Sequence, residues 1–255
     1  MKQRHLKLLR LIFIGALLLG TQGIWSAEAF GKSENSPPNP RAIIIFVDMS
    51  GSTNQARRTV YKEAFEKIYP NLRQGDRVVV GTITSRSYID FKPTVDEEIP
   101  KKTLWDNRLQ FEKKLTNSKE KIRGGVNKLL SRERGSPLTE ILDSLNIADT
   151  IFHDEKERQR ILVILSDMIQ DSKEYNFEKD KITDEYINNV ITYRQKNNLM
   201  PNLTGIKVYV AGASAADSNR FRAVQTFWDR YFTKSGADFS PHRYGHSLIS
   251  FENGP

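Results

Sequence analysis

The pattern of apolar and polar positions divides most of the chain into alternating strands and helices. Unbroken apolar runs at 42–47 and 161–165 are rich in β-branched residues, which is typical of strands covered on both faces of a sheet. Further strands are predicted at 77–83, 88–95, 206–210 and 247–251. The run at 88–95 is expected at the sheet edge, because Pro93 cannot donate a ladder hydrogen bond.

Between these strands, apolar residues recur at three- and four-residue steps, which is the period of helices packed on a sheet. The predicted helices cover about 60–68, 104–130 as one helix or two joined near 117–118, 137–151, 182–194 and 219–232. Strands that alternate with helices in this way predict an α/β fold with a doubly wound, mostly parallel sheet and helices on both faces.

The first 29 residues have the pattern of a secretory signal peptide. Four bases precede an apolar stretch at 11–20, and Ala27-Glu28-Ala29 matches a small-residue cleavage site. We expect cleavage after Ala29, with an uncleaved membrane anchor as the alternative. Residues 30–40 are rich in Ser, Asn and Pro and are predicted to form a linker, and 41–255 are predicted to form one domain. An exported protein, periplasmic or extracellular, follows from this prediction.

Composition excludes some classes of function. The 255 residues contain no cysteine, so neither a disulfide framework nor a thiol for lipid attachment is available. The formal charge of +8 falls once the four bases and one acid of the leader are removed. Basic pairs such as Arg57-Arg58 lie in stretches rich in acidic residues, which favours solvated helix faces over a nucleic-acid partner.

Polar side chains gather where the buried strands end. Asp48, Ser50 and Ser52 follow the first apolar run, Asp167 follows the run at 161–165, and Thr139 lies at the start of the preceding helix. Ligands of open α/β sheets bind outside the carboxyl ends of the strands, so these side chains can meet at one rim. Two carboxylates and three hydroxyls form an all-oxygen set that suits Mg²⁺, Mn²⁺ or Ca²⁺.

The spacing Asp48-x-Ser50-x-Ser52, with Thr139 and Asp167 later, resembles the metal-ion-dependent adhesion site of von Willebrand factor A domains. The resemblance covers most of the chain from Arg41 onward. It implies that Ser50, Ser52 and Thr139 contact the metal directly, and that Asp48 and Asp167 act through water or hydrogen bonds. It also implies a non-enzymatic, cation-dependent module whose open coordination position accepts an Asp or Glu carboxylate from a protein partner.

Other interpretations of the same residues stay open at this stage. Asp48 could be the nucleophile of an exported phosphatase or phosphotransferase, although Ser50 stands where that chemistry wants a second Asp. The site could also be vestigial in a structural scaffold. Ser136 and Pro137 have the pattern of a helix N-cap and first helical residue, which would leave Thr139 as part of a cap. The stretch 97–134 predicts an added helical element near the site that contributes to partner choice.

Overall fold

The computed structural model describes residues 39–51, 53–132 and 135–252. Its centre is a six-stranded sheet with the order β3-β2-β1-β4-β5-β6, in which only β3 runs antiparallel to its neighbour. The strands are β1 (Arg41–Asp48), β2 (Arg77–Ile83), β3 (Val95–Glu98), β4 (Gln159–Leu165), β5 (Ile206–Ala211) and β6 (Tyr244–Gly245). The predicted α/β doubly wound, mostly parallel sheet is therefore confirmed.

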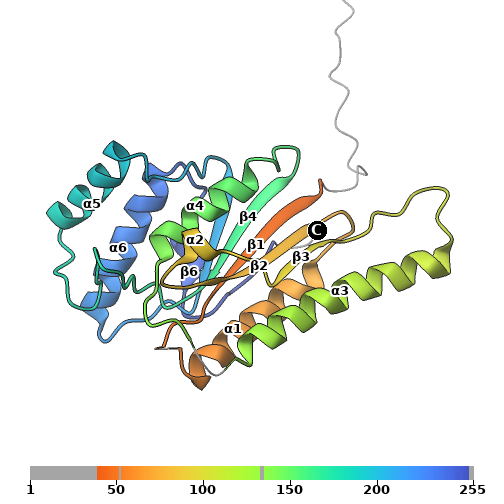
Figure 1. The fold of residues 1–255 in the computed structure, drawn as a ribbon, viewed down its shortest axis with the longest axis horizontal. Helices are drawn as coiled ribbons and strands as arrows, with labels where there is room; N and C mark the ends of the chain where they lie inside the picture. The colour runs from red at the N-terminus through yellow and green to blue at the C-terminus, as the bar shows by residue number, and fades with distance from the viewer. Residues whose placement is uncertain (1–38, 52, 133–134, 253–255) are drawn as a thin grey trace, which may run out of the picture. The chain divides into compact units, whose positions relative to one another are not determined.

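Helices cover both faces of this sheet (Figure 1). They are α1 (Gln55–Ile68), α2 (Ser87–Asp90), α3 (Arg108–Leu130), α4 (Ile141–Phe152), α5 (Asp184–Lys196) and α6 (Ser218–Lys234), with short 3₁₀ turns at Tyr69–Asn71 and Pro241–Arg243. Among the described residues, none of these helices is both long enough and apolar enough to cross a membrane. Residues 1–38, which include the predicted signal peptide and most of the predicted linker, lie outside the described part of the chain.

The two faces of β1 serve two separate hydrophobic cores. Ile43, Ile45 and Val47 pack with α1 and α3, whereas Ile44 and Phe46 pack with α4, α5 and α6. All eight residues of the strand are buried. The alternation of side chains along a strand therefore explains why the sequence of β1 is apolar without interruption.

The predicted edge strand at 88–95 is wrong in its bounds. Residues 87–90 form the helical turn α2, and Phe91 packs edge-on against Phe46 with ring centroids 5.8 Å apart. A Cβ on Gly81 would lie 2.3 Å from the Phe91 ring, so the glycine makes room for this packing. Pairing with β2 begins when the Thr94 amide donates to the Val80 carbonyl, and β3 follows Pro93.

The C-terminal strand predicted at 247–251 is also wrong. The last strand is β6, which comes before residue 247 in the chain and pairs with the end of β5. Leu248 and Phe251 are buried against the core on the α1 and α3 face as side chains of an irregular segment. Apolar spacing alone did not distinguish such a segment from a strand.

Two helices begin later than their apolar patterns predicted. The helix expected from 104 is a single helix that starts at Arg108, and Leu104, Trp105 and Leu109 are largely exposed. The helix expected from Pro137 starts at Ile141, because the Gln170 side chain accepts from the Ile141 and Leu142 amides at 2.8 and 3.1 Å. A side chain 28 residues away, which sequence reasoning missed, therefore supplies the cap expected from Ser136.

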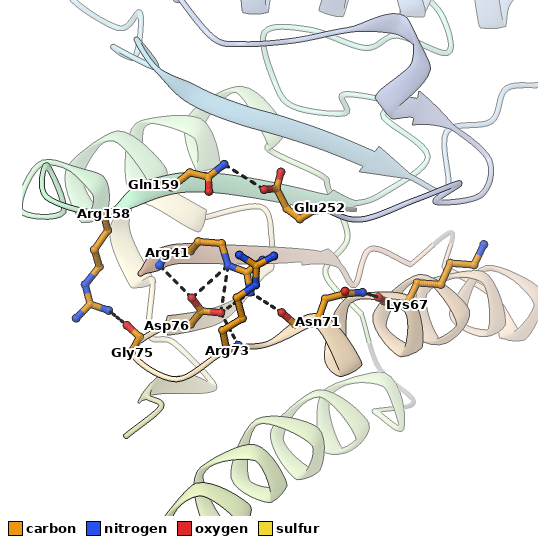
Figure 2. A network of polar contacts seen from close by, with 9 residues as sticks. All are labelled: Arg41, Lys67, Asn71, Arg73, Gly75, Asp76, Arg158, Gln159 and Glu252. Carbon is orange, nitrogen blue, oxygen red and sulfur yellow. Dashed lines mark hydrogen bonds and ion pairs between the residues drawn. The ribbon is translucent and has the colours of Figure 1, made fainter. Parts of the chain in front are cut away.

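A buried ion pair holds the start of β1 (Figure 2). The Arg41 and Asp76 side chains are both fully buried, with Arg41 Nη2 2.5 Å from Asp76 Oδ2. The Asp76 carboxylate also accepts from the Arg41 and Arg73 amides, and Arg41 Nη2 donates to the Asn71 carbonyl. These bonds connect the first residue of the central strand to the turn before β2.

We predict that Asp76→Ala lowers the free energy of unfolding by about 3–5 kcal/mol, because it leaves a buried guanidinium without its counter-charge. The exposed pair between Arg123 and Glu66 is the control, and Glu66→Ala should cost no more than about 1 kcal/mol. Urea denaturation of both variants measures the difference. Equal losses in the two variants would show that burial of the Arg41 pair contributes nothing.

Candidate metal centre

Asp48 is the last residue of β1 and is only 1% exposed. Its Oδ1 accepts from the Ser50 amide at 2.9 Å, and its Oδ2 accepts from the Ser166 hydroxyl at 2.8 Å. Both carboxylate oxygens are therefore fixed by neighbours from the ends of two adjacent strands. A nucleophile must present a free oxygen to its substrate, so this geometry does not favour the phosphatase alternative.

Ser50 is held by a loop that crosses the end of β1. The Ser136 amide donates to the Met49 carbonyl at 2.8 Å, and the Gly51 amide donates to the Ser136 carbonyl at 2.7 Å. This bridge positions the Ser50 side chain, which is 5% exposed, beside the hydroxyl of Thr53 at 3.4 Å. Residue 52 lies outside the described residues, so the predicted role of Ser52 stays a prediction.

Thr139 precedes α4 and pairs with the loop after β4. Its amide donates to the Asp171 carbonyl at 2.8 Å, and the Asp171 amide donates back at 3.0 Å. Thr139 is therefore part of a short backbone bridge, and the prediction that it begins a helix is wrong. The bridge brings Thr139 to the same rim as the loop after β4, which is where Asp167 lies.

Ser50, Thr139 and Asp167 line one hollow of about 100 Å³. The other residues around it are Gly51, Pro137, Ile169, Asp171 and Glu178. The hollow lies at the carboxyl ends of β1 and β4. From β1 the strands are added in one direction up to β3, and from β4 they are added in the opposite direction up to β6, so this is the switch point of the sheet. Open α/β sheets bind their ligands at this place. The structure thus brings together three of the predicted site residues around the hollow. The fourth, Asp48, accepts a hydrogen bond from the Ser50 amide.

The two carboxylates of the site carry perturbed acidities. Burial raises the pKa of Asp48 above its ordinary value, although hydrogen bonds from Ser50 and Ser166 act in the opposite direction. Burial and the charge of Asp48 raise the pKa of Asp167 to about 6. Each shift means that negative charge is costly here, and a cation bound between the two groups would lower that cost.

Arg57 is a member of the site that sequence reasoning missed. Its Nη1 lies 2.6 Å from Asp167 Oδ2, and its side chain is only 26% exposed. The basic pair Arg57-Arg58 was assigned to a solvated helix face, and for Arg57 this is wrong. The third residue of a helix that follows a rim loop points back toward the rim, and this position was the available signal.

The side chains present fit a hard cation better than a soft one. Within the residues that the structure describes, no group of three or more His, Cys, Asp or Glu side chains is placed to hold a metal ion. The hollow instead combines carboxylate with hydroxyl oxygens, which is a donor set for Mg²⁺, Mn²⁺ or Ca²⁺ with water completing the coordination. His242 and His246, at an interval of four residues, lie exposed in the C-terminal segment after β5 and take no part in this site.

No protein-family model matches the sequence, and no curated protein matches it. Among solved structures, the chain is similar to a von Willebrand factor type A structure from Catenulispora acidiphila, with 15% identity, a TM-score of 0.43, and 78% of this chain and 42% of that chain covered. It is also similar to the manganese-loaded TRAP protein of Plasmodium vivax, with 12% identity, a TM-score of 0.44, and 81% and 68% covered.

A third similar structure is the conserved hypothetical protein BatB from Bacteroides thetaiotaomicron, with 12% identity, a TM-score of 0.40, and 74% and 87% covered. This chain spans less than half the length of the Catenulispora structure. The case for the metal centre depends on the geometry of the chain itself.

Gly135 tests how the site is positioned. A Cβ at this residue would lie 2.2 Å from the Met49 carbonyl oxygen and 2.6 Å from that of Ser50, so the crossing loop requires glycine. We predict that Gly135→Ala lowers the free energy of unfolding by about 1–3 kcal/mol through overpacking. Gly124→Ala in α3 is the matched control, because nothing lies within 4 Å of the added Cβ.

In the control, alanine in a helix should raise stability by about 0.5–1 kcal/mol. Chemical denaturation of both variants measures the two effects. A neutral Gly135→Ala would mean that the loop does not need its close approach to β1.

Proposed function

We propose that this chain is an exported von Willebrand factor A-like domain that binds Mg²⁺, or Mn²⁺ or Ca²⁺, and uses the cation to hold a protein partner. Ser50, Ser52 and Thr139 would contact the cation directly, and Asp48 and Asp167 would act through water or hydrogen bonds. The partner supplies an Asp or Glu carboxylate, and no covalent bond is broken.

One observation carries this proposal. Burial raises the pKa of both Asp48 and Asp167, and the charge of Asp48 raises the pKa of Asp167 further, beside a hollow that hydroxyl-bearing side chains also line. Arg57 supplies a positive charge to Asp167, while Asp171 and Glu178 add further carboxylates to the lining of the hollow. A divalent cation would complete the neutralisation and would find oxygen donors already arranged by the loops after β1 and β4.

The arrangement suits binding rather than turnover. When bound, a divalent cation supplies an electrophilic coordination position for a partner oxygen. Ser50 and Thr139 are neutral donors, so they leave much of the charge of the cation available to an incoming carboxylate. Asp48 is held by Ser166 and by the Ser50 amide, so its negative charge is fixed close to the rim without being presented there.

We predict that Asp48→Ala weakens Mg²⁺ and Mn²⁺ binding by about 10–100-fold, because it removes a fixed charge that orients the Ser50 loop. Thr139→Ala should weaken binding less and should be rescued by excess cation. Arg57→Gln should strengthen binding, because it removes a competing positive charge. Calorimetric titration measures all three affinities, and circular dichroism verifies that each variant is folded.

Asp229→Asn is the matched control, because this exposed carboxylate lies on α6 and away from the rim. Its cation affinity should equal that of the wild type. Unchanged affinity in a folded Asp48→Ala variant would falsify the metal centre. Partner binding is then tested by capture from cell envelope, with and without prior removal of divalent ions.

Export is the second part of the proposal, and it depends on residues 1–29 alone. We predict that the exported protein begins at Phe30, because cleavage should follow the Ala27-Glu28-Ala29 pattern. N-terminal sequencing of material from the culture medium or the periplasm measures this. Intact Met1 in a membrane fraction would contradict cleavage and would indicate an anchor.

A further inference from the structure

A second cavity, of about 460 Å³, opens between the edge of the sheet and the C-terminal half of α3. Its volume lies within the range of about 300–1,000 Å³ that is usual for small-ligand sites. The residues that line it come from the end of β2, the segment before β3, and α3 with the turn after it: Thr82, Thr84, Phe91, Lys92, Pro93, Thr94, Gly125, Lys128 and Arg132.

Close packing of α3 on the sheet edge shapes this cavity. A Cβ on Gly125 would lie 2.1 Å from Cγ2 of Val95, so glycine is what allows α3 to approach β3 here. Lys128 and Arg132 follow Gly125 by three and seven residues, which places all three on one side of the helix and its final turn. The close approach of α3 to β3 at Gly125 therefore also brings Lys128 and Arg132 to the lining of the cavity.

The described part of the lining carries positive charge. It contains Lys92, Lys128 and Arg132, and no acidic residue stands among the described residues that line the cavity. Within the described residues, none of these three cations forms an ion pair, whereas Arg77 and Arg158, at the opposite end of the sheet, pair with carboxylates. Thr82 and Thr94 also line the cavity and add hydroxyl groups that can donate to an anion. Crowded like charges are unfavourable until an anion joins them.

This basic cavity adjoins the metal rim. Thr84 lines the cavity, and its carbonyl accepts from the amide of Glu140, the residue after Thr139. The next residue, Ser85, donates its amide to the Ser136 hydroxyl at 2.7 Å, and Ser136 is bridged to the Ser50 loop. Hydrogen bonds therefore connect the segment that lines the basic cavity to the loops that carry Ser50 and Thr139.

We propose that the basic cavity binds a second carboxylate side chain of the same protein partner, so that the recognised segment of that partner is acidic at more than one position. The inference rests on the proposed function, because it identifies the chemistry of the partner whose first carboxylate reaches the cation. An extended peptide places its alternate side chains on one side, about 6–7 Å apart, so a single segment can present more than one carboxylate to the same face of this protein.

The test uses a fluorescently labelled tetraglutamate peptide and the full chain. Divalent ions are removed with a chelating resin, because a soluble chelator is itself a polyanion and would compete for the cavity. Fluorescence anisotropy then gives the affinity without metal and with Mg²⁺. The double variant Lys128→Gln, Arg132→Gln should bind the peptide at least about tenfold more weakly in both conditions.

The matched control is Lys113→Gln, Lys114→Gln, which removes the same charge from the same helix, at residues outside the cavity lining. It should change affinity by less than about threefold, as expected for screened surface charge. Equal losses in the two double variants would overturn the inference, because the peptide would then follow net charge alone. Inorganic phosphate that displaces the peptide at micromolar concentration would also overturn it, because the cavity would then be a phosphate site.

The outcomes separate this inference from the metal centre. Loss of peptide binding in the cavity variant, with Mg²⁺ affinity at its wild-type value, would support the second subsite. A chain that binds Mg²⁺ but shows no cavity-dependent peptide binding would lose the inference and keep the metal centre. A chain that binds the peptide through the cavity but binds no divalent cation would lose the metal centre while retaining an acidic partner.

Discussion

Burial of β1 on both faces is the constraint on which the rest of the structure depends. Every residue of this strand is enclosed by two helical layers, so the chain meets solvent again only where the strand ends. Asp48 is the last residue of the strand and is still buried, Gly51 is the first exposed residue after it, and β4 ends beside Asp48 in the same direction. Parallel pairing therefore brings two carboxylates from distant parts of the sequence to one rim, and the loops that follow them carry the remaining donors.

Most of the fold was predictable because its signals are local. The apolar runs of β1 and β4 and the helical periods between strands are determined by burial on the sheet, and their bounds agree with the sequence within a few residues. The exceptions depend on tertiary contacts. Phe91 packs over Gly81 and displaces the expected edge strand, and Gln170 caps α4 from the loop after β4. Neither contact leaves a period or a motif in the sequence.

The candidate site divides in a similar way. The proximity of Ser50 and Asp167 followed from strand ends, since the topology of a doubly wound sheet determines which ends are adjacent, whereas Thr139 reaches the same rim through its backbone bridge to Asp171. Arg57 was missed because a basic residue in the first turn of a polar helix usually faces water, and only the three-dimensional position of the β4 loop shows its ion pair with Asp167. The basic cavity was missed for the same reason, since its cations come from two separate segments, Lys92 from the stretch before β3 and Lys128 and Arg132 from the end of α3 and the turn after it. The predicted contribution of the stretch 97–134 to partner choice stays a prediction.

The buried pair of Arg41 and Asp76 has a consequence for strand register. Sliding β1 by one residue relative to β2 would turn every one of its side chains to the opposite core, and a strand that is apolar on both sides offers little resistance to such a slip. The ion pair does resist such a slip. A shift would separate the Arg41 guanidinium from Asp76 and would leave two unpaired charges in the interior. The ion pair thus fixes the register of β1 from its first residue. That register determines which residue, seven positions later, lies at the carboxyl end of the strand beside the site.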